Sequence, residues 1–200
     1  ANATGANAVA TGANASAAGN AAAYGDNSKA TGGWSSAFGN ESKATATDAS
    51  AFGNSANVST QNGTAIGSHS TVTAINGTAL GNQANVTIPG GVALGQGSSS
   101  SRTALNKNKV KITAGHVEDS EGISQNDDNN KNGDVYAPVK LIDKAEVLER
   151  VKNTIFGSAG AVSLGKDGET TRQLTNLAPG SADSDAVNVA QLKAVVSAFP

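Results

Sequence analysis

Cysteine and methionine are both absent from this 200-residue chain, and aromatic residues make up only 4% of it. Without cysteine, the chain has no disulfides, no thiol catalysis and no thiolate metal site. With so few bulky side chains, a sequence of this length does not fill an ordinary globular core by itself. We therefore expect an oligomeric protein rather than one monomeric globular domain.

Strong charge and long apolar runs are missing as well. The formal net charge is -2, so the chain lacks the positive potential with which nucleic-acid-binding proteins attract phosphates. No run of about 18 apolar residues is present to span a bilayer. The chain shows no leader peptide and starts within repetitive sequence, so we expect it to be part of a longer protein.

A repeat of 14 residues dominates the first half of the chain. In each unit an alanine and a larger apolar residue precede a glycine, and a weaker echo follows seven residues later, which indicates two short strands and two turns. A one-residue contraction before Gly25 shifts the frame once. The sequence therefore predicts a mainly β fold, a β-roll solenoid over residues 1–100, with about seven coils stacked at roughly 4.8 Å into a rod some 35 Å long. The repeated glycines are Gly25, Gly39, Gly53, Gly67, Gly81 and Gly95.

Alternation along a strand assigns the two residues before each glycine to opposite faces. We expect the larger apolar residues to line the inside of the roll and the alanines to face outward, where their small size allows a second chain to approach closely. The predicted core column is Tyr24, Phe38, Phe52, Ile66, Leu80 and Leu94. The predicted outward column is Ala23, Ala37, Ala51, Ala65, Ala79 and Ala93.

Residues 101–159 interrupt the repeats and are expected to project from the roll. They begin with a basic, strand-like segment, continue through an acidic loop and end in a helix over 143–156, which Asp143 caps. The basic run is the one charge cluster that suggests a partner, either anionic glycans or acidic surfaces of matrix proteins. The alternative is pairing with a neighbouring chain or with Glu118, Asp119 and Glu121. The basic residues are Arg102, Lys107, Lys109 and Lys111.

The roll motif returns once, at residues 160–165, and opens a segment over 160–183 that joins the roll to a final helix over 184–200. Ser184 and Asp185 are expected to cap this helix. Its apolar residues are spaced by three, four and three, as in a coiled-coil seam. The predicted seam residues are Val189, Leu192, Val196 and Phe199.

Two segments carry a family resemblance. Arg-Gln-Leu-Thr-Asn-Leu-Ala at 172–178 and Asp-Ala-Val-Asn-Val-Ala-Gln-Leu-Lys at 185–193 closely resemble the neck of YadA-like trimeric autotransporter adhesins, and the repeats resemble their heads. The resemblance implies a homotrimer of three left-handed parallel β-rolls, a neck where chains cross, and a coiled-coil stalk. The membrane anchor is expected outside this segment. Residues 98–159 are similar to the long neck insertions of the ubiquitous surface protein A type.

The resemblance further implies a non-catalytic adhesin head, exposed at the bacterial outer membrane, that binds host extracellular matrix or cell-surface proteins without a cofactor. Two alternatives stay open. A trimeric β-helix enzyme of the acyltransferase type would need six-residue repeats and a catalytic histidine. An ice-binding solenoid would need regular threonine columns, and the column of Thr31, Thr45, Thr73 and Thr87 is interrupted by Ser59.

No catalytic or metal constellation is expected. His69 and His116 do not have the spacing of metal ligands or of a catalytic pair. The loop that begins at Asp128 imitates a calcium loop, but Val139 occupies its twelfth position, where a bidentate glutamate is needed. Trp34, the one tryptophan of the chain, lies in a turn segment, where it serves either as a contact residue or as packing over a coil edge.

Overall fold

The structure is a computed structural model that describes residues 1–103 and 159–198. The described chain separates into two units. The first unit contains the repeats together with residues 159–172, and the second contains residues 173–198.

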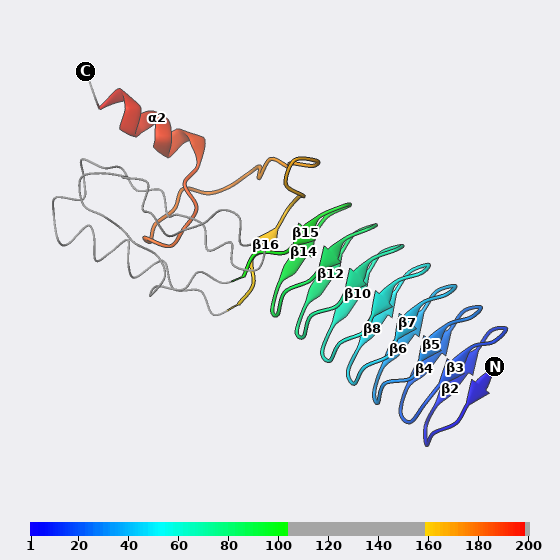
Figure 1. The fold of residues 1–200 in the computed structure, drawn as a ribbon. Coiled ribbons are helices and arrows are strands. Elements are labelled where there is room, and N and C mark those ends of the chain that lie inside the picture. Colours follow the sequence, from blue (N-terminus) through cyan, green and yellow to red (C-terminus); the bar gives the residue numbers. More distant parts are fainter. Residues whose placement is uncertain (104–158, 199–200) are drawn as a thin grey trace, which may run out of the picture. The chain divides into compact units, whose positions relative to one another are not determined.

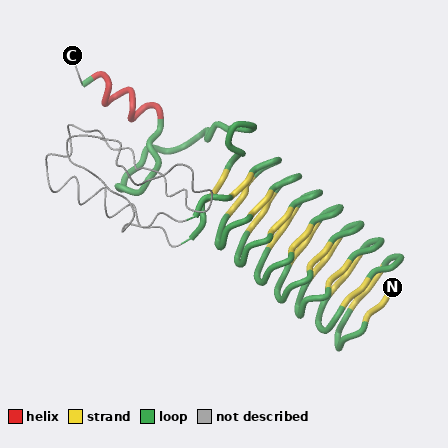
Figure 2. The backbone as a smooth tube through the Cα atoms, viewed as in Figure 1, coloured by secondary structure: helices red, strands yellow, loops and turns green. Residues whose placement is uncertain are grey.

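The first unit is a solenoid of two parallel sheets, each with eight strands. Figure 1 shows the coils stacked in chain order, and Figure 2 shows the short strands separated by turns. The first sheet contains β1 (Asn2–Ala3), β3 (Ser16–Ala17), β5 (Lys29–Ala30), β7 (Lys43–Ala44), β9 (Asn57–Val58), β11 (Thr71–Val72), β13 (Asn85–Val86) and β15 (Ser99–Ser100). The second sheet contains β2 (Val9–Thr11), β4 (Ala22–Tyr24), β6 (Ser36–Phe38), β8 (Ser50–Phe52), β10 (Thr64–Ile66), β12 (Thr78–Leu80), β14 (Val92–Leu94) and β16 (Val162–Ser163).

Each strand pairs in register with the strand one coil further along the chain. Ala65 of β10, for example, lies opposite Ala79 of β12. The turn between β3 and β4 is one residue shorter than the turn between β5 and β6, and the predicted contraction falls there. The predicted solenoid, with two strands and two turns in each coil, is confirmed.

The repeated glycines are required by the close stacking of coils. Gly39 has a φ of 134°, and a Cβ placed on it would lie 2.5 Å from the carbonyl oxygen of Gly53 in the next coil. Only glycine satisfies both conditions, because a side chain is strained at this φ and has no space toward the neighbouring backbone. The period of the sequence is therefore the period of the backbone contacts.

The interior of the roll is narrow and filled by small side chains. Buried serines close the turns from inside the roll: the Ser42 hydroxyl donates to the Gly39 carbonyl oxygen at 2.8 Å, and the Ser70 hydroxyl donates to the Gly67 carbonyl oxygen at 2.7 Å. No buried side-chain nitrogen or oxygen in the described residues lacks a hydrogen-bond partner. The fully buried alanines of the second sheet are Ala23, Ala37, Ala51, Ala65, Ala79 and Ala93, and the buried valines of the first sheet are Val58, Val72 and Val86.

The predicted assignment of the two columns was therefore wrong. The alanines lie inside the roll, and the large apolar residues expected in the core lie on its outer surface. Turns of only four residues, such as 25–28 between β4 and β5, hold the two sheets too close together for aromatic side chains to fit between them. The six misassigned core residues are Tyr24, Phe38, Phe52, Ile66, Leu80 and Leu94.

Residues 159–172 complete the roll. β16 adds to β14 with Val162 opposite Val92, which confirms the predicted return of the roll motif. Arg172 then lies across the last coil, and its guanidinium donates to the Ser98 hydroxyl and to the carbonyl oxygens of Gln96 and Leu164. The last coil therefore gains hydrogen bonds from a residue more than 70 positions later in the chain.

The second unit contains the helix α2 (Val189–Ser197). Asn188 caps it, because its side-chain oxygen accepts from the Gln191 N–H at 3.0 Å and the Gln191 side chain accepts from the Asn188 N–H at 3.2 Å. The predicted cap at Ser184 and Asp185 was wrong. The Asp185 carboxylate instead accepts from the N–H groups of Ser181 and Ala182, and these bonds hold its pKa below the usual value.

Other predictions fall on residues 104–158, which lie outside the described residues. These include the helix over 143–156 and the loop that begins at Asp128. Across residues 1–103 and 159–198, no helix has the length and apolar character needed to cross a membrane.

Candidate functional surface

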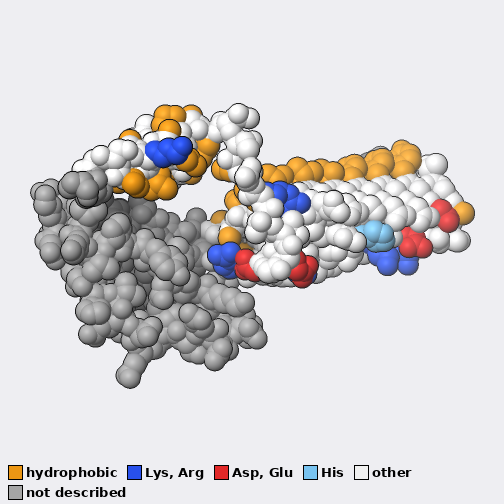
Figure 3. Space-filling view, turned by 90° about the horizontal axis from the view of Figure 1, so that it is seen from above, with side chains coloured by type: hydrophobic (Ala, Val, Ile, Leu, Met, Phe, Trp, Pro, Cys, Tyr) orange, Lys and Arg blue, Asp and Glu red, His pale blue; other side chains and the backbone are white. Residues whose placement is uncertain are grey.

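The main exposed apolar feature of the roll is a column on the outer face of the second sheet, which we call the apolar stripe. Figure 3 shows hydrophobic side chains in a continuous row along the roll. The exposed fractions of five members lie between 37% and 43%, and Phe38 is partly buried between its neighbours. The members of the apolar stripe are Tyr24, Phe38, Phe52, Ile66, Leu80 and Leu94.

Stacking of the coils brings the aromatic members of the stripe into contact. The rings of Tyr24 and Phe38 have centroids 4.8 Å apart, and those of Phe38 and Phe52 are 5.1 Å apart, with nearly parallel planes. These contacts cover only the flanks of the side chains and leave their outer edges in water. A contiguous apolar patch on a soluble surface marks a place where another molecule binds.

A second apolar surface lies on α2. The exposed fractions of Val189, Leu192, Val195 and Val196 lie between 56% and 67%. A helix that stays alone in water does not usually present so many large apolar side chains. Val189, Leu192 and Val196 are predicted seam residues. The remaining predicted seam residue, Phe199, lies outside the described residues. The helix has the surface that a coiled coil needs.

The predicted basic run is described only at its first residue. Arg102 is exposed, and its guanidinium lies 3.3 Å from a carboxylate oxygen of Asp167. Both side chains are exposed, so the ion pair contributes little to stability. The other three members, Lys107, Lys109 and Lys111, lie outside the described residues, as do the acidic residues predicted to pair with them.

A pair of lysines on the roll is not among the predicted site residues. Lys29 on β5 lies directly opposite Lys43 on β7, and both are exposed. Neither forms an ion pair with any residue in the described ranges. The signal was present in the sequence, because two lysines 14 residues apart occupy the same position in successive coils.

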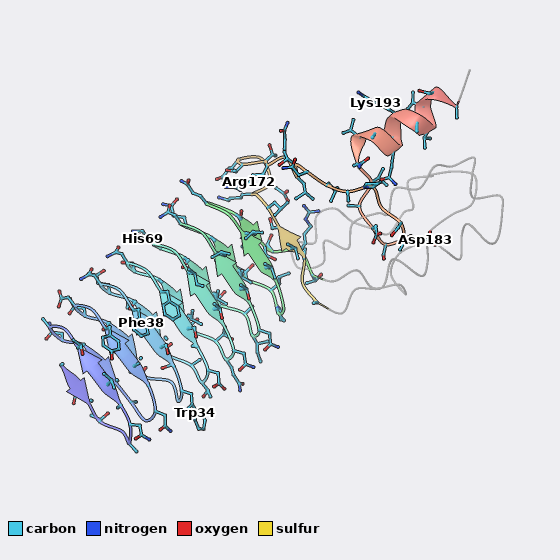
Figure 4. All side chains as sticks on the ribbon, turned by 180° about the vertical axis from the view of Figure 1, so that it is seen from behind. Trp34, Phe38, His69, Arg172, Asp183 and Lys193 are labelled. Carbon is cyan, nitrogen blue, oxygen red and sulfur yellow. The ribbon has the colours of Figure 1, made fainter. Side chains whose placement is uncertain are left out.

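The turns form two polar edges along the roll, and each turn carries a residue in the left-handed backbone region. Asparagine side chains bond along both edges, as where the Asn7 amide donates to the Asn20 side-chain oxygen at 3.1 Å. Figure 4 shows Trp34 at one edge and His69 at the other. The residues with positive φ on the edge of Trp34 are Asn7, Asn20, Trp34, Asp48, Asn62, Asn76 and Gly90.

The partial threonine column bonds along the roll. The hydroxyl of Thr73 donates to the Val86 carbonyl oxygen at 3.3 Å, and those of Thr45 and Thr87 make the same bond in their own coils. Three of the four threonine hydroxyls in the column therefore have a backbone acceptor in the next coil. The described residues contain no cluster of three histidine, aspartate or glutamate side chains placed to hold a metal ion.

Comparison with known proteins relates these surfaces to one family. Residues 30–56, 44–70 and 73–98 match the YadA head domain repeat, and residues 173–199 match the coiled stalk of trimeric autotransporter adhesin. No curated protein matches the chain. Among solved structures, the chain is similar to the collagen-binding domain of the Yersinia adhesin YadA, with 27% identity, a TM-score of 0.56, and coverage of 96% of this chain and 84% of that one. Head repeats, stalk segment and fold are together similar to those of the YadA-like trimeric autotransporter adhesins, in their head and neck region.

Proposed function

We propose that this chain forms a homotrimeric head on the bacterial outer surface that binds host extracellular matrix proteins without catalysis. The observation that carries the proposal is the similarity to the collagen-binding domain of the Yersinia adhesin, which extends over 96% of the chain. Cell-surface proteins of the host are further candidates for the same surface.

The exposed apolar surfaces support the homotrimer. In a single chain, the apolar stripe leaves six large side chains in contact with water, and α2 leaves four. Packing against other copies removes both surfaces from water, at roughly 25 cal/mol for each Å² of apolar surface buried. The spacing of three and four residues between Val189, Leu192 and Val196 on α2 is that of a helix packed in a coiled coil.

The rest of the roll suits an extended, uncharged partner. Serine, threonine and asparagine dominate the outer face of the first sheet, with Lys29 and Lys43 as the charged exceptions. A collagen triple helix is itself a rod with exposed backbone groups, so it can lie along many coils at once. Weak contacts repeated along each roll and on three subunits then add up to tight binding.

Surface plasmon resonance on an immobilised triple-helical collagen peptide tests this proposal. The variant Leu80→Asp places a charge in the apolar stripe and should dissociate the trimer, so apparent affinity should fall about 100-fold as avidity is lost. Gln61→Asp adds the same charge at an exposed turn on the edge opposite the stripe and should keep both trimer and affinity. Equal binding by monomer and trimer would contradict the proposal.

The basic run is proposed as a second contact, with anionic glycans. Arg102 is exposed, and its pair with Asp167 leaves the guanidinium partly free for another anion. Reversal of charge at Arg102, Lys107, Lys109 and Lys111 should abolish retention on immobilised heparin at low salt. Unchanged retention would remove this contact from the proposal.

A further inference from the structure

Trp34 occupies a backbone position that does not suit a tryptophan. Its φ is 55°, in the left-handed region, which asparagine adopts readily and large side chains adopt rarely. The equivalent residue in the coil before is Asn20, and the one in the coil after is Asp48. Glu41, His69 and Gln83 also have positive φ, but Trp34 has the largest side chain in this conformation among the described residues, and its size points to a role other than the stability of the turn.

The indole contributes little to packing within the chain. The exposed fraction of Trp34 is 63%, the highest among the large apolar side chains of residues 1–103. It lies at the edge of the roll, away from Phe38 in the apolar stripe (Figure 4). A Cβ added at the preceding Gly33 would meet no atom within 4 Å, so the surface beside the indole is open.

The ladder of side-chain amides is interrupted at this place. Asn7 donates to Asn20 at 3.1 Å, and Asn62 donates to Asn76 at 3.0 Å, but neither Trp34 nor Asp48 joins them. Among the described residues, the Asp48 carboxylate has no hydrogen-bond or ion-pair partner. The gap therefore contains a flat aromatic surface next to one free carboxylate, with the carboxamide of Asn20 on its other side.

This combination matches the chemistry of a sugar. One face of a hexopyranose presents C–H groups that pack on the electron-rich face of an indole. Its hydroxyls, at the rim of the ring, need carboxylate and carboxamide partners. Asp48 repels anionic sugars, and no other residue with positive φ on this edge carries a charge, so a neutral sugar fits best.

We propose that Trp34, with Asn20 and Asp48 on the neighbouring coils, forms a binding site for a neutral hexopyranose of a surface glycan. The indole stacks on the ring, and Asp48 and Asn20 bind its hydroxyls. Each chain contributes one such site, so a trimer has three and gains avidity for branched or clustered glycans. This site goes beyond matrix-protein binding, and its test reads the two activities separately.

Tryptophan fluorescence reports on this site alone, because Trp34 is the only tryptophan in the chain. The trimer is titrated with five neutral disaccharides: lactose, maltose, cellobiose, mannobiose and diacetylchitobiose. A saturable shift of the emission with at least one of them is expected. No shift with any of the five overturns the proposal, and a shift with the triple-helical peptide alone overturns it in favour of a protein contact.

The variant Trp34→Asn separates a binding role from a structural one. Asparagine suits the left-handed turn, so the melting temperature should rise by about 2 °C. Saturation-transfer NMR on the disaccharide that shifted the emission should show at least a tenfold loss of binding, and Asp48→Asn should weaken it severalfold. Affinity for the collagen peptide should not change. A lower melting temperature with sugar binding intact would assign Trp34 to packing and overturn the site.

Discussion

The roll and the C-terminal segment are stabilised in different ways. In the roll, each coil bonds to the next through backbone hydrogen bonds, and its buried polar groups find partners within the same chain. In the segment over 173–198, the one helix is nine residues long and has no buried residue. A helix this short is marginal by itself in water. The comparison indicates that the roll folds on contacts within the chain, whereas the helix depends on contacts between chains.

The largest expected effect is on the inside of the roll. Ala65→Phe places an aromatic ring between two sheets that admit only small side chains, and should destabilise the roll by about 3 kcal/mol or more. Ile66→Phe is the matched control, because Phe52 already occupies that column in the preceding coil. Thermal unfolding followed by circular dichroism measures both variants. Equal losses in the two would contradict the assignment of inner and outer columns.

A somewhat smaller effect is expected where coils meet at a glycine. Gly67→Ala directs a methyl group at the carbonyl oxygen of Gly81 at a φ of 132°, and should cost about 2 kcal/mol. Gly97→Ala also has positive φ, but its methyl group meets no atom within 4 Å, so about 1 kcal/mol is expected. Urea unfolding compares them. A smaller loss of unfolding free energy for Gly67→Ala than for Gly97→Ala would show that close stacking of the coils is not the reason for the repeated glycines.

The smallest effect concerns pH in the C-terminal segment. Hydrogen bonds from Ser181 and Ala182 lower the pKa of Asp185 from its ordinary value of 3.8, so the ionised carboxylate favours the folded loop. Because the folded pKa is depressed, this stabilisation is present above about pH 4 and is lost as the pH falls through the folded value. Asp185→Asn should make the melting temperature of the segment depend less on pH between pH 5 and pH 2. An unchanged pH dependence of the melting temperature would show that the Asp185 charge does not stabilise the loop.

The sequence predicted the coils well because each coil repeats one set of backbone contacts. The glycine period, the contraction and the return of the motif near Val162 all follow from local pattern. The inner face could not be predicted in this way, since alternation separates Ala37 from Phe38 but does not show how far apart the sheets lie. The usual preference for large apolar residues inside fails in a roll this thin.

Other features depended on competing local signals or on distant residues. Ser184 and Asp185 resemble a helix cap, but the reciprocal bonds of Asn188 and Gln191 place the helix start later. The partner of Arg102 is Asp167, which is 65 residues away, and no local pattern indicates that pair. In the site proposed around Trp34, the sequence indicated an aromatic residue in a turn, as a contact residue or as packing over a coil edge, and its exposure came from the structure. The strained φ and the unpaired Asp48 needed the structure.

The central claim is that copies of this chain cover both the apolar stripe and the apolar face of α2. Light scattering coupled to size-exclusion chromatography tests it most directly, on the chain and on the variant Leu192→Asp at micromolar concentration. The unmodified chain should elute as a single species at three times its mass of 19.6 kDa, and Leu192→Asp should shift it toward the monomer. A well-folded species of 19.6 kDa for the unmodified chain would contradict the account.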